Sequence, residues 1–330
     1  MSHVVSRTAG RSIGIAAAAM TLAAIASPAQ AQDWPARPIR MMIGAGPGGG
    51  TDIIARIVAD PLARQLGQAV VIENRPGAGT TLASEMVSKS EPDGYSTVLM
   101  SAGHAVAAAI YKTLRYDSVT DFQAASLVAA IPLVLITRND SPIKDVKTLI
   151  EHARAKPDEP SYGTGGVGTT MHLSAELLQQ IEGIKLRHIP HRTAPQLVQA
   201  LEAGDVDLVF ETMPAVLGQI QAGTRRAIAV TTRARFPGLP NVPTLAESGV
   251  RDFDVSSWYA VAFPARIPAA IVDRMSAAVA ATVKDPDVAK RALDIAFVVR
   301  SSTPAETQKH LEAEVRRWRQ VVEARGVPQQ

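Results

Sequence analysis

The sequence predicts an α/β protein of two domains with mostly parallel sheets. Short apolar runs typical of strands alternate with amphipathic helical patterns along the chain, as in parallel sheets with helices on both faces. The length of 330 residues favours two domains over one. Glycine-rich loops follow several of the apolar runs, at the strand ends where α/β sheets bind ligands.

The first 31 residues predict an export signal. Arg7 and Arg11 precede an apolar stretch over 13–25, and Ala29-Gln30-Ala31 fits a signal-peptidase site. The apolar stretch is too short and too alanine-rich for a good membrane span. We expect cleavage after Ala31 and a mature protein in the periplasm, with an uncleaved anchor as the alternative.

Composition excludes several classes of function. The chain has no cysteine, which excludes disulfides, thiolate metal sites and a cysteine nucleophile. The formal charge of +3 falls to +1 once the two signal-peptide arginines are removed, so nothing favours a nucleic-acid partner. An aromatic content of 4% also argues against stacking platforms for bases.

The first glycine loop predicts an anion site. The apolar run 39–43 predicts a buried strand, the glycine-rich loop 44–50 follows, and an amphipathic helix begins near Thr51 and Asp52. Either side chain can cap that helix by accepting a hydrogen bond from a free backbone N–H. Strand, loop and helix N-terminus leave several N–H groups beside the positive end of a helix dipole.

Three kinds of anion site compete for this loop. A phosphate P-loop is excluded because no lysine follows the glycines. Gly44, Gly46 and Gly49 fit a dinucleotide fingerprint, and Glu73 stands at a suitable distance. Pro47 and export to a compartment without the nicotinamide cofactor weaken that hypothesis. A carboxylate receptor is the third, and a glycine turn without a ligand remains open.

A second glycine loop, 73–81, follows the predicted strand 69–72 and leads into another helix. Loops at the carboxyl ends of neighbouring parallel strands lie side by side, so the two loops should flank one crevice. A third loop, 163–169, leads into the predicted helix 170–181 and offers hydroxyl groups and helix N–H groups.

The remaining elements follow from periodicity. An apolar run over 124–131 predicts a crossing between the domains. Further predicted strands cover 97–100, 134–137, 185–189, 207–211 and 227–231, and further helices cover 146–155, 194–203, 214–221, 269–283 and 303–324. Dense charges on the last helix predict a solvated face: Glu312, Glu314, Arg316, Arg317 and Arg319.

Signals for catalysis and metals are incomplete. Ser141 and Lys144 match S-x-x-K, but the accompanying S-D-N and K-T-G motifs are absent. His188 and His191 form H-x-x-H without a third ligand, and we expect His104 at the rim or the start of a helix rather than on a metal. We therefore expect no enzyme, no cofactor and no metal.

An ordered set of motifs resembles the substrate-binding receptors of tripartite tricarboxylate transporters, the Bug proteins. Each motif is modest, but the set covers essentially the whole mature chain in the family's order. The motifs are W-P-A-R-P-I-R (34–40), G-P-G-G-G-T-D (46–52), E-N-R-P-G-A-G (73–79), P-D-G-Y (92–95), Y-D-S-V-T-D-F (116–122), G-T-G-G-V-G-T-T-M-H-L-S-A-E-L (163–177), L-V-Q-A-L-E-A-G-D-V-D (197–207), A-G-T-R-R-A-I-A-V-T-T (222–232) and L-P-N-V-P-T-L-A-E-S-G (239–249).

The resemblance implies a two-domain periplasmic-binding-protein architecture of the Venus flytrap type, with a hinge of crossing strands. Domain one would comprise 32–131 and 229–330, and domain two 132–228. The ligand would lie in the cleft between them, where the two loops of domain one hold a carboxylate through backbone amides and water. By position this implicates Gly48, Gly49, Thr51, Asp52, Ala78, Gly79 and Thr81. Asp52 suits capping and loop shaping better than contact with an acid.

The loops of domain two would complete the site. The candidates there are Thr164, Gly166, Gly168, Thr169, His172, Arg192 and Glu211. His172 should brace the loop, Arg192 could bind a far carboxylate, and Glu211 could line the cleft. The chain departs from the family's usual pattern at Gly50, at Thr80-Thr81 and at His191, which leaves the identity of the ligand open.

The expected function is a monomeric periplasmic receptor that captures a small organic carboxylate and delivers it to the membrane permease subunits of a tripartite transporter. An extracytoplasmic sensor that presents its ligand to a signalling partner is the alternative. An exported enzyme is a third hypothesis, which turnover rather than stoichiometric binding would reveal.

Overall fold

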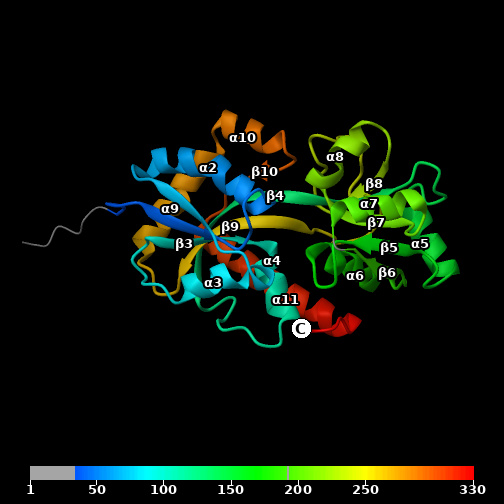
Figure 1. Ribbon diagram of the computed structural model, residues 1–330, viewed down its shortest axis with the longest axis horizontal. Helices are drawn as coiled ribbons and strands as arrows, with labels where there is room; N and C mark the ends of the chain where they lie inside the picture. Colours follow the sequence, from blue (N-terminus) through cyan, green and yellow to red (C-terminus); the bar gives the residue numbers. More distant parts are fainter. Residues whose placement is uncertain (1–33, 192) are drawn as a thin grey trace, which may run out of the picture.

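The computed structural model describes residues 34–191 and 193–330, and it shows two lobes joined by a continuous twisted sheet (Figure 1). The predicted signal peptide and Arg192 lie outside the described residues. Among the described helices, none is long and apolar enough to cross a membrane.

The first lobe holds three parallel strands in the order β2-β1-β3, next to the antiparallel strand β9. Its strands are β1 (Ile39–Ile43), β2 (Val70–Asn74), β3 (Ser96–Ser101), β9 (Ser256–Pro264) and β10 (Val298–Val299). Its helices are α2 (Gly50–Leu66), the 3-10 turn η1 (Ala78–Thr80), α3 (Thr81–Ser88), α4 (Ala102–Ile110), α9 (Ala269–Val283), α10 (Pro286–Leu293) and α11 (Pro304–Arg325).

The second lobe repeats this plan with the parallel order β7-β5-β6. Its strands are β5 (Ser161–Thr164), β6 (Arg187–Pro190), β7 (Leu208–Thr212) and β8 (Arg226–Val230). Its helices are α5 (Val146–Ala155), α6 (Thr170–Glu182), α7 (Ala194–Ala203) and α8 (Met213–Gln221). Both lobes therefore direct the loops after their parallel strands towards the space between them (Figure 1).

One long strand, β4 (Phe122–Thr137), belongs to both lobes. It pairs antiparallel with β9 as far as Pro132, and from Leu133 onwards with β7 and β8. The expected crossing run and the expected strand after it are thus one continuous strand. Sequence periodicity separated them because Pro132 interrupts the apolar run. The domain boundaries stay a prediction, although β4 changes partners close to the first of them.

The apolar core forms two layers, one on each face of the sheet. One layer includes residues of α3, α4, α6 and α11, and the other includes residues of α2, α8, α9 and α10. Each layer extends through both lobes, because β4 carries buried side chains on both of its faces over most of its length. This core makes the strand ends a rigid base for the loops.

Several local expectations need correction. Strand β9 and helix α10 were not predicted, although the run Ser256–Pro264 is apolar and aromatic enough to indicate a buried strand. Glu314 is not solvated: it is buried and accepts hydrogen bonds from the indole N–H groups of Trp258 and Trp318 at 3.0 and 3.2 Å. His104 starts a helix but lies in the core rather than at a rim, hydrogen-bonded to Ser84.

Candidate functional site

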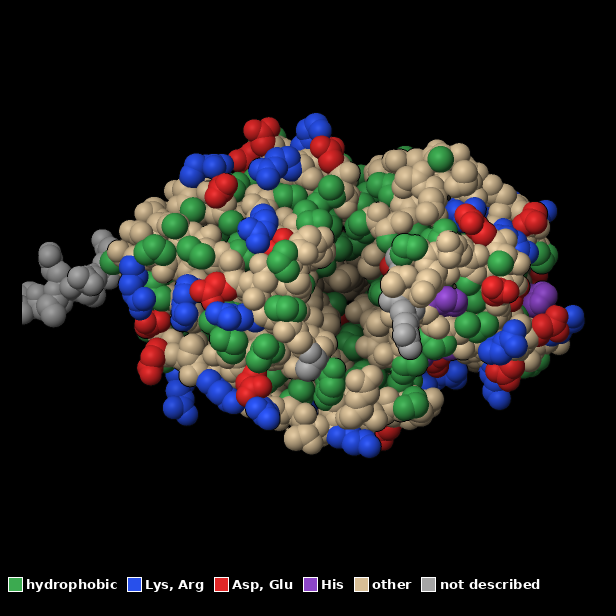
Figure 2. All heavy atoms as spheres, in the orientation of Figure 1, with side chains coloured by type: hydrophobic (Ala, Val, Ile, Leu, Met, Phe, Trp, Pro, Cys, Tyr) green, Lys and Arg blue, Asp and Glu red, His purple; other side chains and the backbone are tan. Residues whose placement is uncertain are grey.

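A cavity of about 430 Å³ lies in the hollow between the two lobes that Figure 2 shows. Both lobes line it, and none of its described lining residues is Asp, Glu, Lys, Arg or His. The lining comprises Thr51, Gly79, Thr80, Ser101, Gly103, Val106, Ala107, Ile110, Tyr111, Val167, Gly168, Thr169, Thr170, Met171, Thr212, Ser257, Tyr259 and Gln330. A ligand here would meet backbone amides, hydroxyls and apolar side chains.

Five helices begin at this cavity: α2, α3 and α4 from the first lobe and α6 and α8 from the second. Four of them, all except α6, start without a hydrogen bond from a capping side chain. Of the five described helices that begin away from the cavity, α5, α7, α10 and α11 are capped by a side chain and α9 is not. The first-turn N–H groups of an uncapped helix lack intrahelical partners, so they can bind an anion beside the positive end of the helix dipole.

Asp52 supports the first glycine loop from behind. The N-cap of α2 is Gly49, so the prediction that Thr51 or Asp52 caps this helix is wrong. Asp52 lies in the first turn of α2, where its Oδ2 accepts the N–H of Gly48 at 2.9 Å and its Oδ1 lies 2.9 Å from Arg56. The hydrogen bonds from Arg56 and Gly48 outweigh burial and hold the pKa of Asp52 well below its usual range. The carboxylate therefore remains ionised and engaged within the protein.

Asn74 joins the first two glycine loops. Its Nδ2 donates to Asp52 Oδ1 at 2.9 Å and to the carbonyl oxygen of Ala45 at 3.0 Å. The predicted proximity of these loops thus has a physical basis in one amide at the end of β2.

The second loop turns tightly at Gly79. This residue has φ +62°, and a Cβ there would lie 3.0 Å from the hydroxyl of Tyr111, so both conformation and space favour glycine. Thr80 follows with φ +79°, an uncommon conformation for a threonine, and its buried Oγ1 has no hydrogen-bond partner. This unpartnered hydroxyl on a cavity-lining residue could bind a ligand or water.

The third loop brings the second lobe close to α4. Gly168 has φ +75°, and a Cβ there would lie 3.2 Å from Ile110 across the cleft. Thr169 caps α6 by accepting the N–H of His172 at 3.2 Å. His172 Nδ1 in turn accepts the N–H of Gly168 at 3.2 Å, so the histidine braces the loop from inside the lobe.

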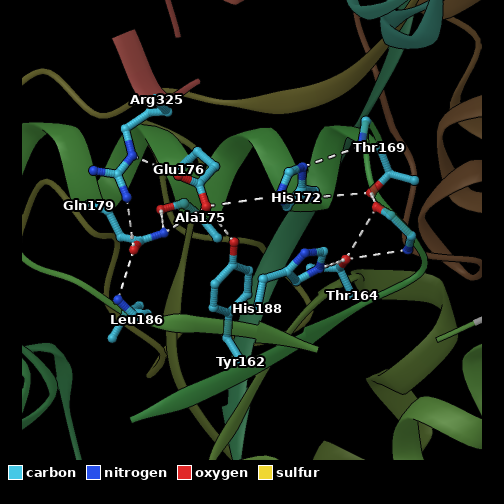
Figure 3. Close-up of polar contacts among 12 residues, drawn as sticks. Tyr162, Thr164, Thr169, His172, Ala175, Glu176, Gln179, Leu186, His188 and Arg325 are labelled. Atoms are coloured by element: carbon cyan, nitrogen blue, oxygen red, sulfur yellow. Dashed lines mark hydrogen bonds and ion pairs between the residues drawn. The ribbon is translucent and has the colours of Figure 1, made fainter. Parts of the chain in front are cut away.

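A buried polar network extends from this loop to the last helix (Figure 3). The ring of His172 stacks on His188 at 4.2 Å between centroids, and its Nε2 lies 3.8 Å from Glu176. Glu176 accepts hydrogen bonds from Tyr162 at 2.6 Å and from Arg325 of α11 at 2.7 Å. The network therefore links the ligand loop of the second lobe to a helix of the first.

Burial and ion pairing determine which side chains of this network are charged. Burial, together with the neighbouring His172, lowers the pKa of His188 to about 4, and burial also lowers the pKa of His172. Burial alone would raise the pKa of Glu176, but the hydrogen bonds from Tyr162 and Arg325 outweigh it and lower that pKa. Both histidines are therefore neutral at pH 7, beside an ionised Glu176 that is paired with Arg325.

The floor of the cavity lies where the lobes meet. The hydroxyl of Tyr259 on β9 interacts with Ser257 and Thr51, and burial raises the pKa of this tyrosine. On the other side, Thr212 ends β7, and its N–H and hydroxyl both donate to Glu211, at 2.7 and 3.0 Å. Glu211 does not line the cavity, and burial raises its pKa. It orients Thr212, which does line it.

The fourteen predicted site residues fall into three groups. Those that line the cavity are Thr51, Gly79, Gly168 and Thr169. Those that shape the loops or helix starts behind the cavity are Gly48, Gly49, Asp52, Thr81, Thr164, Gly166, His172 and Glu211. For the other two, the side chain of Ala78 and all of Arg192 lie outside the described residues.

Sequence reasoning missed most of the remaining lining. Ser101 and Gly103 follow β3 as the glycine loops follow their strands, so strand-end position could have indicated them. Tyr259 and Ser257 lie on β9, a strand that was not predicted, and Gln330 reaches the cavity only because Gln330 N–H donates to Ile110. No group of three or more His, Cys, Asp or Glu side chains in the described part of the chain could hold a metal.

Residues 54–327 match the family described as "Tripartite tricarboxylate transporter family receptor". Curated relatives cover almost the whole chain. A protein described as "UPF0065 protein in the TAR-I ttuE-ttuC' intergenic region" of Agrobacterium vitis is 35% identical over 90% of this chain and 87% of its own length. Protein BugT of Bordetella pertussis is 33% identical over 92% of this chain and 94% of its own length.

Solved structures share the fold. R. palustris Rpa4515 with adipate superposes with a TM-score of 0.74 at 33% identity, over 90% of this chain and 100% of that one. The periplasmic binding protein BugD gives 0.71 at 32% identity with the same coverage. MatC from Rhodopseudomonas palustris with bound malate gives 0.70 at 28% identity, over 88% of this chain and 100% of that one. The two-lobed architecture is thus that of periplasmic binding proteins.

Proposed function

Because the chain belongs to the tripartite tricarboxylate transporter receptor family, we propose that it captures a small organic carboxylate in the cavity between its lobes and delivers it to a membrane permease. The proteins of this family are periplasmic solute-binding receptors rather than enzymes. A periplasmic location, after cleavage behind Ala31, belongs to the same proposal.

One observation carries the choice of ligand. Four of the five described helices that begin at the cavity have no capping side chain, whereas four of the five described helices elsewhere are capped, and the described cavity lining has no charged side chain. Helix N-termini that lack a capping side chain leave first-turn N–H groups that are costly to bury without an anion or water. Unpaired N–H groups and hydroxyls suit a carboxylate, whose oxygens accept several hydrogen bonds.

The relatives support this class of ligand. Rpa4515 binds adipate and MatC binds malate, and both share the fold over most of this chain. Ligand capture would draw the lobes together, because a ligand touching both lobes binds the closed arrangement better than the open one. The permease would then recognise the closed, ligand-bound arrangement.

Calorimetry of the mature protein with adipate, malate and citrate tests the proposal. We expect saturable binding of at least one of these acids at one ligand per chain, and a raised unfolding midpoint in its presence. Absence of binding by any carboxylate, after unfolding and refolding to remove a carried-over ligand, would refute a carboxylate receptor. Uptake of the bound acid by cells that express the permease subunits tests delivery and separates a transport receptor from a sensor.

A matched pair of variants tests the helix N-termini. Gly49 is the N-cap of α2 with φ −74°, so aspartate and asparagine can both adopt its conformation and cap the helix. A Cβ there would lie 3.3 Å from the carbonyl oxygen of Gly46, a tight contact that both variants share. Gly49→Asp would place a fixed negative charge against the N–H groups and should weaken carboxylate binding about tenfold or more, by charge repulsion of about 1.4 kcal/mol or more. Gly49→Asn, of the same shape, should weaken it much less. Equal affinities for the two variants would show that the carboxylate binds elsewhere.

A further inference from the structure

A second space of about 710 Å³ adjoins the proposed carboxylate cavity, and Thr212 and Tyr259 line both. We call it the apolar chamber. Its lining comprises Gly50, Ile53, Ile131, Thr212, Pro214, Ala215, Leu217, Gly218, Gln221, Tyr259, Asp294, Ile295 and Phe297. Figure 2 shows hydrophobic side chains on both walls of the hollow between the lobes.

Some apolar side chains of the chamber wall remain partly open to solvent, although Tyr259 and Phe297 are only 4% and 2% exposed. Ile53 of α2 is 39% exposed, and the rings of Tyr259 and Phe297 lie 5.6 Å apart. Leu217 on α8 is only partly buried in the opposite lobe. Apolar surface that faces a ligand cavity is unfavourable in water and is stabilised when an apolar group covers it.

Helix α2 connects the two spaces. Thr51 in its first turn lines the carboxylate cavity, while Gly50 and Ile53 line the chamber. One helical turn rises about 5.4 Å, so a carboxylate at the N-terminus of α2 lies within a few carbon atoms of Ile53. A ligand bound by its carboxylate can therefore extend its other end into the chamber.

The charges in the chamber disfavour a second carboxylate there. Asp294 is the only charged residue among its described lining, and its carboxylate is already paired with Lys290 at 2.6 Å. A second ligand carboxylate would lose water and gain no cationic partner from the described lining. An amine would find only the carboxylate that Lys290 already neutralises.

We propose that the ligand of this receptor is a monocarboxylate with an extended apolar tail, the carboxylate held at the helix N-termini and the tail in the apolar chamber. This inference rests on the proposed function and names the class of its substrate. Short polar acids would fill only the carboxylate cavity.

Affinity across an acid series tests the inference. Calorimetry of the mature protein with linear monocarboxylates from acetate to octanoate should show binding that tightens about threefold to fourfold for each methylene that enters the chamber. The α,ω-diacid of the same length as octanoate should bind more weakly than octanoate. Constant affinity along the series, or stronger binding of the diacid, would overturn the inference.

A chamber-filling variant gives an independent test. Gly218 on α8 faces the chamber, and a Cβ there would have no atom within 4 Å, so Gly218→Leu adds bulk without a clash. This variant should weaken octanoate at least tenfold and leave acetate unchanged. Ala222→Leu, at the exposed end of the same helix and outside the chamber, should change neither affinity. Equal weakening of both acids by Gly218→Leu would overturn the inference.

Failure of the inference differs from failure of the proposed function. If short and long acids bind equally well, the chain is still a carboxylate receptor, but the inference that its ligand has an apolar tail is wrong. If no acid of any length or charge binds, both fall together.

Discussion

The loops that border the cavity are supported in different ways in the two lobes. In the first lobe, buried and ionised Asp52 holds the loops through Gly48, Asn74 and the solvent-exposed Arg56. In the second lobe, neutral His172 braces the loop from a buried position, stacked on His188. One support depends on a charge that must stay ionised, and the other on rings that must stay uncharged.

The two supports also differ in reach. The first lies within residues 45–74 and involves a single lobe. The second continues through Glu176 to Arg325 at the end of α11, so it includes a contact between the lobes. Changes in the second network should therefore affect the stability of the whole molecule, while changes in the first should act mainly on the ligand loops.

The largest effect should come from Arg325→Ala. This variant leaves the buried carboxylate of Glu176 without its cation, and should lower the free energy of unfolding by about 2–3 kcal/mol, since Arg325 is 26% exposed and so the loss falls short of a fully buried pair. Urea unfolding measures it. Arg316→Ala, on the exposed face of the same helix, should cost less than about 0.5 kcal/mol.

A second substitution distinguishes the loss of the Arg325 charge from the loss of its packing as the cause of the lower stability. Glu176→Gln in the Arg325→Ala background should restore part of the lost stability, because the amide has no charge to compensate and Tyr162 can still donate to it. If the double variant is no more stable than Arg325→Ala, the ion pair does not account for the link between the lobes.

Asp52→Ala should have a smaller effect on stability and a clear one on binding. Gly48 N–H loses its acceptor and Asn74 Nδ2 loses one of its two, at a cost of about 2 kcal/mol to folding. The loop that presents the α2 amides loses its anchor, so carboxylate affinity should fall about tenfold, or about 1.4 kcal/mol by calorimetry. Asp60→Ala, exposed on the same helix, is the matched control, and equal losses in both variants would contradict the role of Asp52.

His172 variants test the neutral support. His172→Phe keeps a ring against His188 but removes the acceptor of the Gly168 N–H, so affinity should fall about fivefold, or about 1 kcal/mol. His172→Gln can still accept that N–H and should lose less. Faster hydrogen exchange at the Gly168 amide in the phenylalanine variant alone would locate the effect; equal exchange in both variants would rule the acceptor out.

The smallest effect concerns pH. The pKa of His188 falls from 6.5 to about 4 on folding, so between these values the unfolded chain binds a proton that the folded chain does not. Its contribution to stability is complete above pH 6.5 and decreases as the pH falls towards 4. Over the same window Asp52 stays ionised in the folded chain, because its pKa is lowered.

The pH effect is measured by comparing variants. His104 and His310 are also buried, with pKa values lowered to about 4, so the wild-type curve reports all of these histidines together. His188→Gln should reduce proton uptake on unfolding near pH 5 by roughly one proton. An unchanged pH dependence in this variant would show that His188 titrates normally in the folded chain.

Local patterns in the sequence were enough to predict most elements and the three glycine-rich loops that border the cavity. Helices such as Val146–Ala155 and Ala194–Ala203 match their predicted ranges, because periodicity and capping are set by residues a few positions apart. The glycine loops follow the same logic, since Gly79 and Gly168 must adopt positive φ within their own turns.

Which side chains face the cavity was decided by the tertiary structure. The cavity meets Thr51 rather than Asp52, and Thr212 rather than Glu211, although each pair is adjacent in sequence. The choice depends on partners far along the chain, such as Asn74 for Asp52 and Arg325 for the brace behind Gly168. Sequence patterns determine the local conformation of a residue and its near neighbours in the chain. The cleft, by contrast, is formed by distant segments that come together only when β4 and β9 pass from one lobe to the other.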